Sequence, residues 1–196
     1  MNRTFLGDAL DHWKGSLFES LRKSKLLKDF AVDPMASDWS DWQPRDKSAF
    51  AHLLRIDESQ LISPEVGLLG RRKQHFDEIE HKGDLFLDPD TGIATGNVKN
   101  MNQYVRSEEI EMLLRDFSRL LAVYQHVSRQ QVRDRVDAVC SKLNKDIDGV
   151  YWSSYESATV AMLFLSRSHQ RVDEVAEHFK GVLGQHAGAR IRTSTK

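Results

Sequence analysis

The sequence predicts an α/β fold in three layers, with helices on both faces of a mostly parallel sheet and a single domain over residues 1–196. Up to residue 143, short apolar runs typical of buried strands alternate with longer segments of helical periodicity. After that point two apolar runs follow each other with only a short polar link between them. Such a link suits a hairpin, so we expect an antiparallel strand pair at the carboxyl end of the sheet.

The elements of the amino-terminal half are predicted from local patterns. A helix is expected over residues 8–27, where leucine and tryptophan recur at helical spacing. A short strand at 30–32 follows and ends at Asp33, because the next residue is a proline, which cannot continue a central ladder. Residues 47–55 favour a short helix. Another helix is expected over 63–81, since it opens with a capping serine, a proline and a glutamate.

The elements of the second half are also predicted from local apolar patterns. Strands are expected at 85–87, 120–124, 149–152 and 159–165. Helices are expected at 107–117, 128–143 and 171–185, the first of them with Phe117 facing inward.

Composition limits the class of protein. With 40% hydrophobic and 29% charged residues the chain is typical of a soluble globular protein. No apolar run approaches the roughly 20 residues that span a bilayer, and Asp8 interrupts the amino terminus too early for a signal peptide. Cys140 is the only cysteine, which excludes an intrachain disulfide and a cysteine-based zinc site. We therefore expect a cytoplasmic protein without a membrane partner, and its net charge of −1 does not by itself indicate nucleic acid.

Candidate functional residues gather where the predicted strands end. Asp88 and Asp90 follow the strand at 85–87, His126 follows the next strand, and Asp33 ends the first. In an open α/β sheet, ligands bind outside the carboxyl ends of the strands, so we expect these side chains at one crevice. The alternative is an ordinary turn, because aspartate, proline and glycine are common turn residues.

The element order and the strand-end motif carry a family resemblance. The order resembles the Rossmann-like sheet of class I S-adenosylmethionine-dependent methyltransferases. Asp88-Pro89-Asp90 resembles the Asp/Asn-Pro-Pro-Tyr/Phe motif of amino-methyltransferases that act on nucleic-acid bases. The resemblance implies that Asp88 accepts a hydrogen bond from the target amine. Asp90 and Thr91 stand where that motif has its second proline and the aromatic that stacks on the base.

A second motif lies near the amino terminus. Residues 7–14, Gly-Asp-Ala-Leu-Asp-His-Trp-Lys, resemble the Gly-Asn-x-x-Asp-x-x-Lys-His motif of bacterial ribosomal RNA adenine-N6 methyltransferases. Asp11 and Lys14 match by spacing, and Gly15 replaces the histidine. The resemblance implies that Lys14 lies near cofactor and target; a routine ion pair between Asp11 and Lys14 on one helix face is the alternative.

Together the two motifs imply S-adenosylmethionine as cofactor, with Asp33 and Asp11 as cofactor-binding residues and nucleic acid as the partner. Most of the chain also resembles a group of small bacterial proteins of uncharacterised function, through its Gly-Asp helix start, its Phe-Leu-Asp-Pro-Asp-x-Gly strand end and its Tyr-Gln-His strand end. The first loop departs from the class I pattern, since no glycine occurs at 32–38, where those enzymes need close backbone approach to the cofactor.

Two alternatives therefore stay open. In the first, Asp88 and Asp90, with His126 nearby, hold Mg²⁺ or Mn²⁺ for phosphodiester hydrolysis. Pro89-Asp90 followed by Asn97-Val98-Lys99 resembles the Pro-Asp…(Asp/Glu)-x-Lys pattern of restriction-type nucleases, with Asn97 in place of an acid. In the second, the chain is a catalytically inactive methyltransferase-like scaffold, for which Trp39 and Trp42 would form an exposed contact surface or else cap the core. The oligomeric state is left open.

Overall fold

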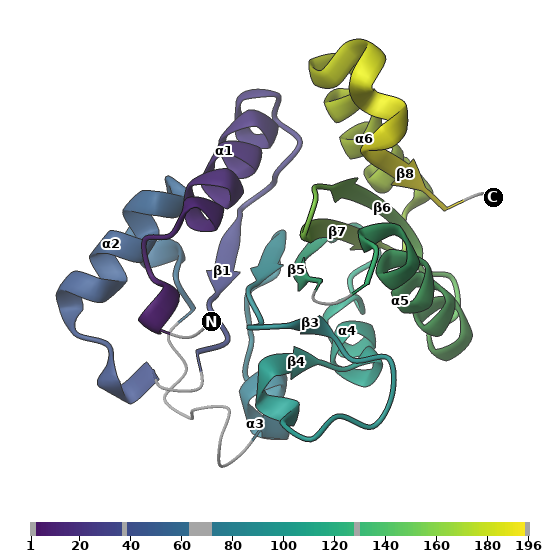
Figure 1. The fold of residues 1–196 in the computed structure, drawn as a ribbon. Helices are drawn as coiled ribbons and strands as arrows, with labels where there is room; N and C mark the ends of the chain where they lie inside the picture. Colours follow the sequence, from purple (N-terminus) through teal and green to yellow (C-terminus); the bar gives the residue numbers. More distant parts are fainter. Residues whose placement is uncertain (1–2, 37–38, 63–71, 128–129, 195–196) are drawn as a thin grey trace.

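A computed structural model of the chain describes residues 3–36, 39–62, 72–127 and 130–194, without the side chain of Trp39 (Figure 1). Its centre is a six-stranded sheet in the order β1-β2-β5-β7-β6-β8. The strands are β1 (Ala31–Asp33), β2 (Leu85–Leu87), β5 (Leu121–His126), β6 (Tyr151–Glu156), β7 (Val160–Ser166) and β8 (Ile191–Thr193). Two two-residue strands, β3 (Gly92–Ile93) and β4 (Tyr104–Val105), form a separate parallel pair.

The sheet is mixed, which corrects the prediction of a mostly parallel one. β1, β2 and β5 run parallel, whereas β7 pairs antiparallel with both β5 and β6. The predicted antiparallel pair of β6 and β7 is confirmed. The balance shifts because β8, which was not predicted, adds a third antiparallel pairing along β6.

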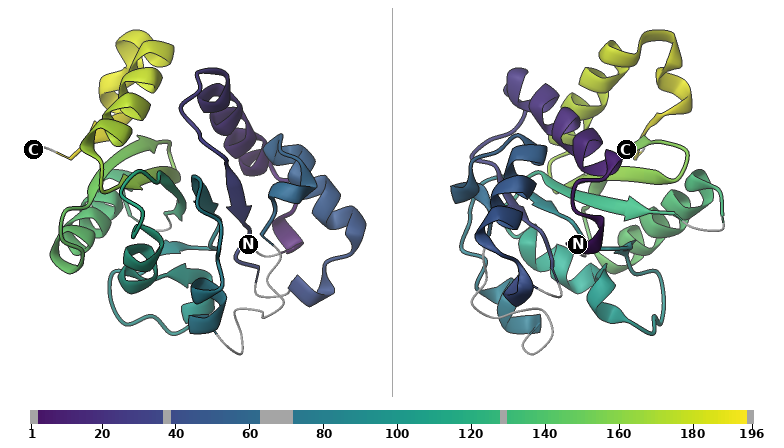
Figure 2. Two further views of the ribbon diagram at one scale, coloured as in Figure 1. Left: turned by 180° about the vertical axis from the view of Figure 1, so that it is seen from behind. Right: turned by 60° about the vertical axis from the view of Figure 1, so that its left-hand side comes forward.

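Helices cover both faces of the sheet, as the three-layer prediction requires (Figures 1 and 2). One face is covered by α1 (Ala9–Lys23), α2 (Pro44–Leu54) and α6 (His169–Leu183), and the other by α3 (Arg72–Asp77), α4 (Ser107–Leu113) and α5 (Val132–Asp146). The hydrophobic core between the sheet and α1, α2 and α6 is called the α1 core, and the one between the sheet and α3, α4 and α5 the α5 core. Successive strand residues point to opposite faces, so Phe86 packs in the α1 core while Leu85 and Leu87 pack in the α5 core. Short 3₁₀ turns occupy Arg3–Phe5, Trp39–Asp41, Glu58–Gln60, Met101–Gln103 and Gly184–Ala189.

Two local predictions differ from the structure, and one open alternative is decided by it. Of the helix expected over 63–81, residues 63–71 lie outside the described part and the helix within the rest is α3. The helix expected over 107–117 ends at Leu113, so Phe117 is 69% exposed instead of facing inward. Of the two roles left open for the tryptophans, Trp42 has the core-capping one, because it is buried and packs edge-on against Phe50 with 5.6 Å between ring centroids. The side chain of Trp39 lies outside the described part.

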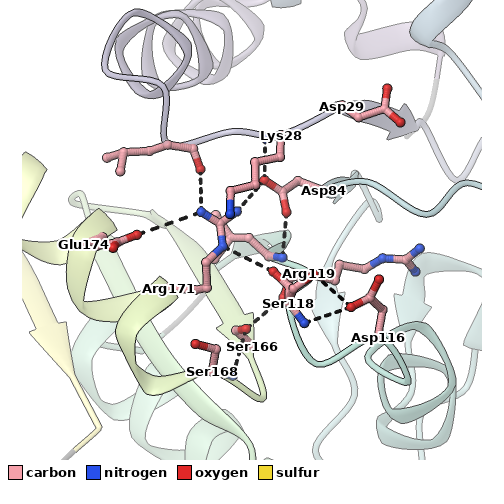
Figure 3. A network of polar contacts seen from close by, with 12 residues as sticks. Lys28, Asp29, Asp84, Asp116, Ser118, Arg119, Ser166, Ser168, Arg171 and Glu174 are labelled. Carbon is pink, nitrogen blue, oxygen red and sulfur yellow. Dashed lines mark hydrogen bonds and ion pairs between the residues drawn. The ribbon is translucent and has the colours of Figure 1, made fainter.

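A buried charge network closes the amino-terminal ends of β2 and β5 (Figure 3). The carboxylate of Asp84 accepts hydrogen bonds from the backbone N–H groups of Lys28 at 2.7 Å and Leu120 at 2.8 Å. Its third donor is Arg171 Nη2 on α6, at 2.6 Å. These three bonds join the Asp84 carboxylate to three different segments of the chain, at the end of the sheet opposite the carboxyl ends of β2 and β5.

No helix among the described residues is both long and apolar enough to cross a membrane.

Candidate functional site

Lys14 lies at the centre of a buried charge cluster at the carboxyl end of β2. Its Nζ donates to Asp88 Oδ2 at 2.8 Å and to Asp11 Oδ1 at 3.1 Å. The same ammonium lies 4.4 Å from the ring centroid of Tyr124, within reach of a cation–π interaction. The Lys14 side chain is 6% exposed and those of both aspartates 1%, so this is a desolvated ion pair and not a surface one.

The start of α1 explains how Asp11 and Lys14 come to face the sheet. Asp8 caps the helix, because its Oδ1 accepts from the backbone N–H groups of Leu10 and Asp11. Asp11 Oδ2 in turn accepts from the N–H of Gly7 at 3.0 Å. One turn further, Gly15 lies against α2, where an added Cβ would be 2.1 Å from the carbonyl oxygen of Leu53. The histidine of the resembled motif does not fit this helix packing.

A cavity of about 320 Å³ opens beside the cluster. Asp11 and Lys14 line it from α1, Tyr124 and His126 line it from β5, and the turn after β2 supplies its other wall. That turn is residues 88–91, the Asp-Pro-Asp-Thr segment. Among the site residues predicted from sequence, Asp11, Lys14, Asp88, Asp90 and His126 thus share one cavity. Four aspartates and one lysine line it, so its formal charge is negative.

The turn after β2 is locked onto the end of β5 by Gln125, which is fully buried. Gln125 Oε1 accepts from Ile93 N at 2.9 Å, and its Nε2 donates to the carbonyl oxygens of Thr91 at 2.9 Å and His126 at 2.8 Å. This arrangement needs a glycine at position 92, where φ is +126° and a Cβ would lie 2.4 Å from Gln125 Oε1. The two strand-end motifs of the sequence therefore form one structural unit.

The structure does not bring Asp33 to the cavity. Asp33 is in register with Leu87, one residue before Asp88, so its side chain points to the opposite face of the sheet. There its Oδ2 lies 2.7 Å from His75 Nε2, and its Oδ1 accepts from Met35 N at 2.8 Å. After β1, Met35 has a φ of +45° and its side chain is buried in the α5 core.

The charge states of the cluster follow from its burial. Burial alone would lower the pKa of Lys14, but the negative charges of Asp88 and Asp11 outweigh it and raise that pKa above its ordinary value. Burial raises the pKa of Asp11, against the opposing effects of Lys14 and the Gly7 N–H. Burial also raises the pKa of Tyr124. Lys14 is therefore a fixed cation and not a nucleophile or base, and Tyr124 stays a neutral phenol.

Two lining residues, Phe5 and Gln103, lie outside the motifs that the sequence analysis singled out. Phe5 precedes the Gly7–Lys14 motif by two residues, so its proximity to that motif was the available signal. Gln103 lies at the cavity because β4, which follows it, pairs with β3. Next to this pair, Thr91 N donates to Gln103 O at 2.8 Å. Strands of two residues leave no pattern from which that pairing could be predicted.

The alternative of a metal-dependent hydrolase requires side chains that can hold Mg²⁺ or Mn²⁺. Among the described residues, no group of three or more His, Cys, Asp and Glu side chains is placed to hold a metal ion. The ammonium of Lys14 already pairs with Asp88 Oδ2 at 2.8 Å. Asn97 and Lys99 are exposed and are not among the residues that line the cavity.

The amino-acid sequence matches no protein-family model, and a search of curated proteins finds no significant match.

Proposed function

We propose that this chain is a methyltransferase-type protein that uses S-adenosylmethionine to methylate an exocyclic amine of a nucleic-acid base. The observation that carries the proposal is the contact between Lys14 and Asp88, which are 74 residues apart in sequence. Each belongs to a motif that resembles a different part of an amino-methyltransferase site. Two unrelated chance resemblances would have no reason to meet in one cavity, so their convergence supports a common role.

The donor set of the cavity suits this cofactor. S-adenosylmethionine carries a sulfonium and an ammonium group against one carboxylate, so a wall rich in aspartate complements its charge. We assign this role to Asp90, which is partly exposed on the cavity wall, together with Asp11. The cavity volume of about 320 Å³ lies within the range of small-molecule sites, roughly 300–1,000 Å³. Asp33 receives no cofactor role, because it lies on the other face of the sheet.

The chain's residues then have distinct tasks. When bound, the cofactor supplies an electrophilic methyl group. Asp88 accepts a hydrogen bond from the substrate amine and orients its lone pair, while Lys14 holds the Asp88 carboxylate in place. His126 lines the same cavity, and we assign it as the base that accepts the proton that the methylated amine loses.

The test is a thermal shift with S-adenosylmethionine, S-adenosylhomocysteine, Mg²⁺ and Mn²⁺ in parallel. A ligand at 100 times its Kd adds about 2.7 kcal/mol of stability, which raises the melting temperature clearly. We expect a shift with the two adenosyl ligands, and transfer of labelled methyl groups to adenine-containing RNA or DNA. No adenosyl shift and no transfer would overturn the proposal. A rise in melting temperature with metal alone would favour metal-dependent phosphodiester hydrolysis. No rise with any of the four ligands would favour a binding scaffold.

Variants at position 88 sharpen the test. The resembled motif accepts aspartate or asparagine, so Asp88→Asn keeps an acceptor oxygen and is expected to retain transfer. Asp88→Leu removes the acceptor and is expected to lower kcat about 100-fold or more. Asp146→Leu is the matched control, because Asp146 is a half-exposed acid on α5 that pairs with Lys142. Equal loss in Asp88→Leu and Asp146→Leu would contradict the role of Asp88.

A further inference from the structure

Phe5 is exposed in a chain that buries nearly all its other phenylalanines. Of nine phenylalanines, seven are buried, and the two exposed ones are Phe5 at 61% and Phe117 at 69%. The guanidinium carbon of Arg167 lies over the ring of Phe117, 5.6 Å from its centroid. Phe5 instead lines the cavity, together with residues of the turn that follows β2.

The backbone that carries Phe5 is tied down on both sides. Asp8 N donates to the carbonyl oxygen of Phe5 at 3.2 Å, which links the turn to the capped start of α1. On the other side, Arg3 pairs with Asp46 at 2.9 Å and donates to the carbonyl oxygen of Asp41 at 3.3 Å. The ring is thus exposed although its attachment is ordered, which lowers the entropy that a ligand must remove on binding.

We infer that Phe5 provides the stacking surface for the substrate, and that the substrate of this cavity is a nucleobase that carries an exocyclic amine. This inference rests on the proposed function and deepens it by assigning the residue that stacks on the base. Thr91 stands where the resembled motif has its aromatic, so the turn after β2 offers no ring of its own. A planar aromatic amine presents a π-face and N–H donors together. The cavity presents the complementary pair, an exposed aromatic residue in Phe5 and an acceptor carboxylate in Asp88.

The experiment compares adenosine with ribose, which lacks the base, by isothermal titration of the full chain. Each ligand is titrated with and without saturating S-adenosylhomocysteine, so that binding at the cofactor's own site is separated from binding at Phe5. We expect adenosine to bind and ribose to bind far more weakly. Phe5→Leu keeps an apolar side chain but removes the ring, and is expected to weaken adenosine about 5- to 150-fold, the range of base stacking on an aromatic.

Two controls make the result specific. Phe117→Leu alters the other exposed phenylalanine, outside the cavity, and is expected to leave adenosine binding unchanged. Phe5→Tyr restores a ring and is expected to restore affinity. Unchanged adenosine binding in Phe5→Leu, equal loss in Phe117→Leu, or no preference of the wild-type chain for adenosine over ribose would each overturn the inference.

Failure of the inference and failure of the proposed function give different results. If transfer of labelled methyl groups persists in Phe5→Leu with an unchanged KM for the nucleic acid, the stacking role is overturned and the proposed function stands. If the wild-type chain binds no adenosyl cofactor but still binds adenosine in a Phe5-dependent way, the proposed function fails and the stacking role stands.

Discussion

The ammonium of Lys14 lies 2.8 Å from Asp88 Oδ2 and 3.1 Å from Asp11 Oδ1, with all three side chains nearly inaccessible to solvent. One cation therefore pairs with two buried carboxylates that come from different segments of the chain. The cluster links α1 to the strand end that forms the cavity wall. The folded state depends on this lysine for a reason separate from any catalytic role.

Replacing Lys14 with methionine should be strongly destabilising. The change leaves Asp11 and Asp88 buried without their partner, and removing one member of a buried pair typically costs about 3–5 kcal/mol. The free energy of unfolding from urea titration measures it. The double variant Lys14→Met/Asp88→Asn should recover part of the loss, since one unpaired charge is then gone. A loss below about 1 kcal/mol is typical of exposed pairs and would contradict the burial of this cluster.

The cost of Lys14→Met should depend on pH. Burial raises the pKa of Asp11 and Lys14 opposes that rise, so without Lys14 the pKa of Asp11 rises further. A carboxyl whose pKa is higher in the folded than in the unfolded state destabilises the fold fully above its folded pKa. This cost shrinks as pH falls below the folded pKa and is gone below the unfolded pKa. The difference in unfolding free energy between wild type and Lys14→Met should therefore be largest near pH 7 and shrink toward pH 4. A difference that grows on acidification would contradict this assignment.

Gly92→Ala should disrupt the turn that forms the cavity wall. A Cβ at this position would lie 2.4 Å from Gln125 Oε1, and φ is +126°, a region that residues with side chains rarely adopt. Backbone strain and overpacking each cost about 1–3 kcal/mol, so a loss of about 2 kcal/mol or more is expected. Gly96→Ala is the matched control, because its Cβ would meet nothing within 4 Å. Equal stability of the two variants would show that Gln125 does not clamp this turn.

Much of the fold could be predicted from sequence because it depends on local apolar patterns. The strand at 85–87 and the apolar faces of α1, α5 and α6 are of this kind. β8 could not, since only Ile191 of its three residues is apolar and its pairing with β6 is long-range. The end of α4 was also missed. Asp116 Oδ1 accepts from Ser118 N at 2.8 Å, and such a side chain–backbone bond competes with continuation of the helix.

The candidate site shows the same division between local and long-range information. Strand ends placed Asp88 and His126 at one edge, and helix spacing placed Asp11 beside Lys14. Which strand-end side chains share a face depends on register, and a shift of one residue reverses the face. Asp33 is in register with Leu87 and so points away from the cavity, a fact that the sequence pattern did not contain.

The buried network at the other end of the sheet should be as important for stability as the Lys14 cluster. Asp84 accepts from two backbone N–H groups and from Arg171, so Arg171→Met leaves a buried carboxylate without its cation (Figure 3). A loss of about 3–5 kcal/mol in the free energy of unfolding is expected. Lys142→Met, which breaks the more exposed i,i+4 pair with Asp146, should cost about 0.5 kcal/mol or less. Similar losses in both variants would contradict the network's role.

Cys140 offers a direct measure of how tightly α5 packs on the sheet. Its thiol is 3% exposed in the α5 core, and burial raises its pKa, so neither access nor thiolate formation favours reaction. With Ellman's reagent at pH 8, the folded chain should react only through opening of this core, with on the order of 0.1 equivalent or less in an hour. The unfolded chain in guanidinium should react completely at its single cysteine. Prompt reaction of the folded chain would show that α5 separates from the sheet readily. Lys14→Met, if it loosens only the opposite face, should accelerate labelling no more than its loss in global stability requires.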